Sequence, residues 1–172
     1  LVDRYNRGEF FSQDSIHQNE ELIYKTKNGR TVYGGGGIMP DVFIPLDTVG
    51  MSDYYHKVWN TNVLYRYTVD FTDRHRAEMD KITTLAELDA LLAQSDLLSD
   101  FIAYAERNGV ERNDEGIAIS REIIEAQLRA YIGRNALHDD AGFYYNIYPI
   151  DNTLKRAVAE LETRLKKSKK KR

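Results

Sequence analysis

The sequence contains no cysteine, three prolines and a single tryptophan among 172 residues. The lack of cysteine excludes disulfide bonds, thiolate nucleophiles and cysteine-ligated zinc sites. No stretch approaches the roughly 20 apolar residues that a membrane-spanning helix needs, and residues 1–20 are too polar for a secretory signal peptide. With a mass of 19.9 kDa, the chain can bury about 70% of its unfolded surface and fold without a metal ion.

Basic residues are scarce outside the C-terminus. The net charge is −3, from 24 basic and 27 acidic residues, and six of the basic residues lie within residues 166–172. Without these six, 18 basic residues face 27 acidic ones and the net charge is −9. We do not expect so acidic a body to bind nucleic acid, because such binding depends on basic contacts to phosphates. We expect residues 166–172 to form a disordered basic tail.

The clearest local signal is a pair of strand-like runs near the N-terminus. Leu22–Thr26 and Thr31–Gly34 are rich in β-branched and aromatic residues, and the segment between them contains Asn28-Gly29. Asn-Gly is preferred in a two-residue type I′ turn, because both turn positions need a positive φ. The sequence therefore predicts a β-hairpin in which Tyr24 faces Tyr33.

A run of four glycines, Gly34–Gly37, follows the hairpin. A phosphate-binding loop would need a Gly-Lys-Ser/Thr sequence that leads into a helix. Here the glycines lead toward an apolar run, Val42–Ile44, between Pro40 and Pro45. We interpret the glycines as a bulge or a close backbone approach, and Val42–Ile44 as an edge strand, where proline is tolerated.

Beyond about residue 50 the hydrophobic pattern has helical spacing and predicts five or six helices. The first is expected over residues 52–78, with a possible break at 60–62. Thr84 and Glu87 form a capping box at the start of the second. The others are expected from Leu97 to a stop at Asn108-Gly109, over residues 118–137 and from about Asp151, with a short aromatic segment at 143–148. The last helix carries one narrow apolar stripe formed by Leu154, Val158, Leu161 and Leu165.

These patterns predict an α+β fold that is mostly α. Residues 1–50 hold the hairpin and the edge strand, residues 51–165 form a helical domain, and residues 166–172 form the tail. A hairpin with one extra strand cannot bury both of its faces and is marginal in water. We therefore expect the β part to belong to a sheet whose other strands lie outside this chain. The start at Leu1 rather than at a methionine agrees with a fragment.

The sequence offers little candidate chemistry. Its four histidines are His17, His56, His75 and His138, and none lies three or four residues from another. His138-Asp139-Asp140 is the best local metal candidate, but adjacent residues converge poorly on one ion, and we expect Asp139 or Asp140 to cap a helical turn. There is no Gly-x-Ser-x-Gly nucleophile elbow, and Ser168-Lys169 lies in the basic tail. We therefore assign no catalytic, cofactor-binding or metal-binding residue.

Twelve tyrosines are notable in a chain of this size. One cluster comprises Tyr54, Tyr55, Tyr65 and Tyr67, and another comprises Phe143, Tyr144, Tyr145 and Tyr148. A tyrosine buries a large ring and keeps a polar tip. The clusters fit either the rim of a core or an interface with a missing domain or a peptide, where tyrosine is enriched.

One segment resembles a known family. Lys27–Val42, with its four glycines and the stretch Gly37-Ile38-Met39-Pro40-Asp41-Val42, is similar to carboxyl-terminal processing (tail-specific) serine proteases. Asp3–Phe10 and the pattern Tyr67-x-x-x-Phe71-Thr72-Asp73-Arg74 are similar to one bacterial branch of that family. The similarity is specific at residues 22–45 and looser in the helices.

The resemblance implies the C-terminal part of a larger envelope enzyme. Such proteins have an export signal, a PDZ domain, an α/β protease core and a C-terminal extension, and they need no metal ion or nucleotide. Their Ser–Lys dyad, in which a neutral lysine takes the serine proton, is implied upstream of this chain. The implied location is the periplasm or cell envelope, and the implied substrates are C-termini of exported proteins. The glycine run and Pro40-Asp41 carry over only as structural residues of the core's last strands.

The expected role of the chain is therefore to complete the protease core and to support packing or assembly, with a homo-oligomer among the possible partners. As a fragment it is expected to be inactive. The alternative is a helical binding module that recruits substrate or adaptor proteins. A third reading, an electrostatic binder that uses Lys166–Arg172, predicts binding that weakens steeply with salt.

Overall fold

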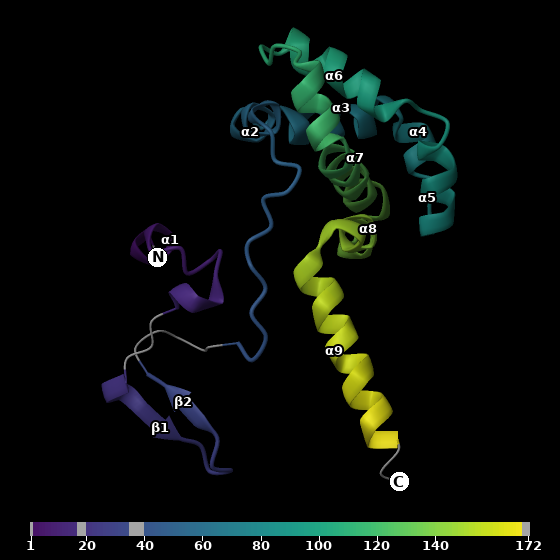
Figure 1. Ribbon diagram of the computed structural model, residues 1–172. Helices are drawn as coiled ribbons and strands as arrows, with labels where there is room; N and C mark the ends of the chain where they lie inside the picture. The colour runs from purple at the N-terminus through teal and green to yellow at the C-terminus, as the bar shows by residue number, and fades with distance from the viewer. Residues whose placement is uncertain (1, 17–19, 35–39, 170–172) are drawn as a thin grey trace. The chain divides into compact units, whose positions relative to one another are not determined.

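The computed structural model describes residues 2–16, 20–34 and 40–169. The chain divides into two compact units, Leu1–Asp47 and Thr48–Arg172. The first contains a small antiparallel sheet, and the second is helical (Figure 1). The α+β, mostly α fold class predicted from the sequence is therefore confirmed. Within the described residues, no helix is both long and apolar enough to cross a membrane.

The first unit is short of regular structure. Its described elements are α1 (Val2–Asn6), η1 (Gln13–Ser15), η2 (Glu20–Leu22), β1 (Ile23–Lys25) and β2 (Thr31–Tyr33). Glu9 is its one buried side chain within the described residues. The Glu9 carboxylate accepts hydrogen bonds from Arg4 Nε at 2.7 Å and from Arg7 Nη2 at 2.6 Å. These hydrogen bonds, followed by the attraction of the two guanidinium charges, lower the pKa of Glu9 from its ordinary value.

The hairpin forms, but the predicted register is wrong by one residue. Tyr24 pairs with Val32, and Tyr33 pairs with Ile23. Thr26 donates its N–H to the Arg30 carbonyl at 2.8 Å, which closes a three-residue loop with Gly29 at a φ of +78°. Such loops are a type I turn followed by a left-handed residue, and they need one positive φ rather than two.

The expected edge strand is also wrong, because Val42–Ile44 is irregular. A strand needs a neighbouring strand to pair with, and the described sheet contains only β1 and β2. Gly35–Gly37 lie outside the described residues, so the structure leaves their interpretation untested. Gly34 donates its N–H to the Leu22 carbonyl, and a Cβ there would lie 2.8 Å from the Tyr24 ring, so Gly34 does mark a close approach.

The second unit is built around one long helix. Its first helices are α2 (Asp53–Asn60), α3 (Val63–Arg74), α4 (Arg76–Met79), α5 (Leu85–Leu92) and α6 (Leu97–Arg107), and they are followed by α7 (Asp114–Leu137), α8 (Asp140–Ile147), η3 (Tyr148–Ile150) and α9 (Asn152–Lys169). Helix α7 contacts α2, α3, α5, α6 and α8, and α9 extends from η3 away from the other helices of its unit (Figure 1). The break at residues 60–62 and the Thr84–Glu87 capping box are confirmed.

Three predictions about the helices need correction. Helix α7 begins at Asp114 rather than 118, because Asn113 accepts the Gly116 N–H at 2.9 Å and so caps the helix. The aromatic segment is the C-terminal part of α8 together with η3. Helix α9 continues to Lys169, so the first residues of the expected disordered tail are helical.

The core lies entirely within the second unit. Its largest fully buried side chains are Tyr54, Tyr67, Phe71, Phe101, Met79, Leu88, Leu92, Ile124, Leu128, Ile132, Val58 and Val63. They come from several helices, and within each amphipathic helix the buried residues lie on one face, as a period of 3.6 residues requires. Burial is the main cause that raises the pKa of Tyr67 to about 12.

Candidate binding groove of the helical unit

A groove of about 540 Å³ opens on the surface of the helical unit. Asp89 of α5, Glu122, Glu125, Ala126 and Arg129 of α7, Tyr145 and Asn146 of α8, and Tyr148, Pro149 and Ile150 of η3 line it. The lining is mostly apolar and includes four charged side chains, which is the usual character of a site that binds a ligand or a peptide.

Acidic groups dominate the charge of the groove. Three carboxylates face one guanidinium, and Arg129 Nη1 lies 3.6 Å from Asp89 Oδ1. Glu125 accepts a hydrogen bond from Arg121 at 3.0 Å, outside the groove lining. Glu122 forms no hydrogen bond or ion pair with any described residue. The groove therefore favours a ligand that carries positive charge.

Tyrosines form one side of this surface. Tyr144, Tyr145 and Tyr148 are 56%, 50% and 40% exposed. Tyr145 donates its hydroxyl hydrogen to Asp89 Oδ2 at 3.2 Å, which fixes the ring at the rim. An exposed group of tyrosines next to a groove is typical of a protein interface. The second tyrosine cluster of the sequence thus fits the interface reading.

The first tyrosine cluster is mostly part of the core. Tyr54, Tyr55 and Tyr67 are 1%, 4% and 1% exposed, and only Tyr65 is open to solvent, at 45%. The interface reading is therefore wrong for the three buried tyrosines. Replacing Tyr54 or Tyr55 by serine should therefore destabilise the core of the helical unit.

Two glycines allow α7 and α8, which both line the groove, to pack closely against each other. A Cβ on Gly142 of α8 would lie 2.5 Å from the Gly133 carbonyl oxygen of α7, and a Cβ on Gly133 would lie 2.7 Å from the Gly142 carbonyl oxygen. The two helix backbones therefore touch at this point, which only glycine permits. Glycine inside a helical pattern is the signal that could have revealed this contact from the sequence.

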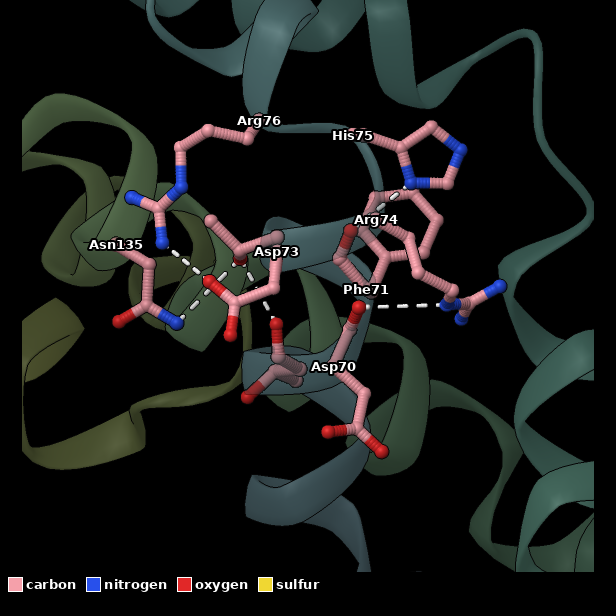
Figure 2. A network of polar contacts seen from close by, with 9 residues as sticks. Asp70, Phe71, Asp73, Arg74, His75, Arg76 and Asn135 are labelled. Carbon is pink, nitrogen blue, oxygen red and sulfur yellow. Dashed lines mark hydrogen bonds and ion pairs between the residues drawn. The ribbon is translucent and has the colours of Figure 1, made fainter.

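The segment Phe71–Arg74, which resembles tail-processing proteases in sequence, lies at the C-terminal end of α3 and takes part in a network of polar contacts. Figure 2 shows Arg74 turned back toward the Asp70 carbonyl and His75 against Phe71. Arg74 Nε donates to the Asp70 carbonyl at 3.3 Å, and His75 Nδ1 donates to the Phe71 carbonyl at 2.9 Å. The His75 backbone N–H also donates to the Phe71 carbonyl, at 3.1 Å, so the side-chain bond adds a second donor at the end of the helix.

The same network links α3 to its neighbours. Tyr104 of α6 donates its hydroxyl hydrogen to Asp70 Oδ2 at 2.7 Å, and Asn135 of α7 approaches Thr72 Oγ1 at 3.5 Å. Asp73 forms an ion pair with Arg76, which Figure 2 also shows. These partners give the network a structural role, and no carboxylate in it points to a nucleophile.

The metal candidate His138-Asp139-Asp140 has a structural role as well. His138 ends α7 at a φ of 50°, Asp139 accepts the Ala141 N–H at 2.8 Å, and Asp140 lies 2.8 Å from Arg134 Nε. The expectation that Asp139 or Asp140 caps the next turn is confirmed for Asp139. The described part of the chain holds no group of three or more histidine and acidic side chains that could bind a metal ion.

The buried serines join two helices. Ser52 donates its hydroxyl hydrogen to the Gly116 carbonyl at 2.8 Å and accepts the Ser120 hydroxyl hydrogen at 2.7 Å. The Ser52 N–H also donates to Ser120 Oγ at 3.0 Å. These bonds tie the start of α2 to α7 and place no base beside either hydroxyl.

Residues 54–138 match a family model described as a family of unknown function, DUF8443. The matched range extends from α2 to the end of α7 and leaves α8, η3 and α9 outside. No curated protein and no solved structure matches the chain. The groove therefore lies across the boundary of the match, with α5 and α7 inside it and the tyrosine-bearing elements beyond it.

Proposed function

We propose that this chain is the non-catalytic C-terminal part of a tail-processing serine endopeptidase, and that its helical unit is a protein-binding module. The groove carries this proposal, because its mostly apolar lining combines exposed tyrosines with three acidic side chains. A segment that fits the groove has apolar or aromatic side chains beside lysine or arginine. The Ser–Lys dyad of the enzyme would lie upstream of Leu1.

The endopeptidase part of the proposal rests on Lys27–Val42 and on the state of the hairpin. Ile23, Tyr24 and Val32 are 48%, 56% and 36% exposed. Apolar side chains on a two-stranded ribbon agree with a sheet that further strands complete. Within this proposal the enzyme acts in the periplasm or cell envelope on C-termini of exported proteins, and the upstream core and PDZ domain are its partners in the same polypeptide.

The parent protein can be tested directly. An antibody raised against this chain should detect, in a cell-envelope fraction, a product well above 19.9 kDa. That product should cleave peptides with apolar C-termini. A native product of 19.9 kDa would contradict the endopeptidase part of the proposal and would leave the binding-module part standing.

The binding module is tested by fluorescence anisotropy with a labelled peptide that alternates lysine with tyrosine or leucine. We expect the chain to bind this peptide, and a peptide with glutamate in place of lysine to bind much more weakly. The double variant Glu122→Lys, Glu125→Lys should lose binding by about tenfold or more. Glu111→Lys, on an exposed loop residue before α7, is the charge control and should leave binding unchanged. Equal binding of both peptides would contradict the proposal.

A further inference from the structure

The apolar stripe of α9 is exposed at its C-terminal half. Leu161 and Leu165 are 61% and 60% exposed, whereas Leu154 and Val158 are half-buried. Their spacing of four, three and four residues is that of a heptad seam, with Val158 and Leu165 at a positions and Leu154 and Leu161 at d positions. Helix α9 extends away from the other helices of its unit (Figure 1), so a second helix can reach the exposed half of the seam.

The charges beside the seam favour one orientation of that second helix. Lys155 and Glu162 occupy e positions, and Arg164 occupies a g position. In an antiparallel pair of identical helices, e positions face each other, so Lys155 of each copy meets Glu162 of the other. In a parallel pair, g faces the following e position, so Arg164 would meet Lys169 of the other copy and repel it. The antiparallel pair therefore has two attractive contacts, whereas the parallel pair has two repulsive ones.

The antiparallel arrangement also brings opposite charges together at the helix ends. When Leu154 lies opposite Leu165 of the second copy, Lys166 and Lys167 lie opposite residues 152–153, within about one helical turn of η3. Tyr148, Pro149 and Ile150 of η3 line the acidic groove. In an antiparallel pair the basic end of each α9 would therefore lie near the groove of the other copy, whose lining is net acidic, and the two basic ends would be held apart.

We propose that two copies of this chain associate through antiparallel α9 helices, with the basic end of each α9 in the acidic groove of the other copy. This inference rests on the proposed role of the groove as a protein-binding surface and names its occupant. The contact is isologous, so every interaction occurs twice around a two-fold axis.

The mass of the full chain in solution is the first test. Sedimentation equilibrium over a range of concentrations should show a reversible dimer of about twice 19.9 kDa. Leu161→Asp should abolish it, because the seam then buries a charge. A mass of 19.9 kDa at every concentration would overturn the inference, and so would a monomer in solution that binds vesicles of anionic lipid through α9.

A charge-swap cycle tests the orientation. Lys155→Glu and Glu162→Lys should each weaken the dimer by about tenfold, since both attractive pairs become repulsive. The double variant Lys155→Glu, Glu162→Lys should restore the wild-type dissociation constant. The two side chains are seven residues apart on one helix, so restoration reports a contact between copies. Arg156→Glu, on the far side of α9 from the seam, carries the same charge change as Lys155→Glu and should leave the dimer intact. A double variant no better than either single one would overturn the antiparallel pair.

The groove contact is tested by Glu122→Lys, Glu125→Lys, which should weaken the dimer, whereas Glu111→Lys should not. An unchanged dissociation constant would overturn the placement of the basic end. Peptide binding is measured separately on Leu161→Asp, whose groove is unoccupied by a second copy. Peptide binding with a monomeric wild-type chain would overturn this inference alone, and a wild-type dimer whose monomeric Leu161→Asp variant binds no peptide would overturn the general binding module alone.

Discussion

Two neighbouring tyrosines of α2 lie in the core with different surroundings for their hydroxyl groups. The Tyr54 hydroxyl is buried and has no hydrogen-bond partner among the described residues. The Tyr55 hydroxyl accepts a hydrogen bond from Gln127 Nε2 at 2.7 Å. Burial raises the pKa of both hydroxyl groups. The same chemical change at the two positions should therefore have opposite consequences.

We expect Tyr54→Phe to leave the free energy of unfolding unchanged or to raise it by up to about 1 kcal/mol, because it removes an unpaired buried hydroxyl. Tyr55→Phe should lower it by about 1 kcal/mol, because Gln127 loses its partner. Urea unfolding followed by circular dichroism measures both. Equal changes in the two variants would contradict the different roles of the hydroxyl groups.

The ion pairs of Glu9 predict that the stability of the first unit depends on pH. Its pKa is lower in the folded state than the ordinary 4.5 because Arg4 and Arg7 donate hydrogen bonds to the carboxylate. A lowered folded pKa means that the stabilisation is complete above about pH 4.5 and is lost as the pH falls through the folded pKa.

The difference in stability between wild type and Glu9→Gln should therefore be constant at neutral pH and shrink below pH 4.5. Amide hydrogen exchange in the first unit at a series of pH values measures it, for example at the Glu9 N–H, which donates to the Arg4 carbonyl at 3.1 Å, and Glu111→Gln is the control at an exposed glutamate. A difference that grew toward acid pH would contradict the ion-pair role of Glu9.

At the scale of elements, the contact between α7 and α8 determines the shape of the groove. Gly142→Ala adds helix propensity of about 1 kcal/mol. It also places a Cβ 2.5 Å from a backbone oxygen of α7, which no side-chain rotation can relieve. We expect the steric overlap to outweigh the gain in helix propensity, so that the free energy of unfolding falls by several kcal/mol.

The variant should also lose peptide binding, because Tyr145 and Tyr148 move with α8. Tyr144→Ala, on the exposed face of the same helix, is the control and should change the stability by less than about 0.5 kcal/mol. Unchanged stability of Gly142→Ala would show that the two backbones do not touch as described. Chemical denaturation and the anisotropy assay measure the two effects.

Two features that depend on local sequence were predicted correctly. The Thr84–Glu87 capping box and the buried face of Leu97–Ala105 both follow from side chains within a few residues of one another. The hairpin register was wrong, because two-residue and three-residue loops both use an Asn-Gly pair and the side chains alone did not distinguish them. Val42–Ile44 was wrong because a strand depends on a partner that is distant in sequence.

At the scale of the whole molecule, the two units differ in their capacity to fold. The hydrophobic core is drawn entirely from residues 54–136, whereas the first unit buries only Glu9 among its described side chains. Hydrophobic burial is the main favourable term in folding, so the second unit has a core of its own and the first does not.

A chain of residues 48–172 should therefore unfold cooperatively, with the midpoint that the helical signal shows in the whole chain. Residues 1–47 alone should give no cooperative transition. Circular dichroism during heating measures both, and the intact chain is the control. A non-cooperative melt of residues 48–172 would contradict the independence of the helical unit.

The groove and the apolar stripe of α9 could be predicted from the sequence to different degrees. The α9 stripe was visible as a pattern, because heptad spacing is local to one helix. Whether that stripe is covered depends on where the other helices pack. The groove brings together α5, α7 and α8, up to about 60 residues apart, so neither its acidic charge nor its tyrosine rim followed from any local pattern.

The sequence by itself determined the helical character of residues 51–165, the caps at Thr84–Glu87 and Asp139, and the resemblance of Lys27–Val42 to tail-processing proteases. These depend on periodicity, on hydrogen bonds between near neighbours and on a contiguous motif. Only the tertiary structure decided which tyrosines are buried, where Gly133 and Gly142 touch, and which acidic side chains share a groove. Burial and proximity depend on contacts between residues that are distant in the chain, and folding brings those residues together.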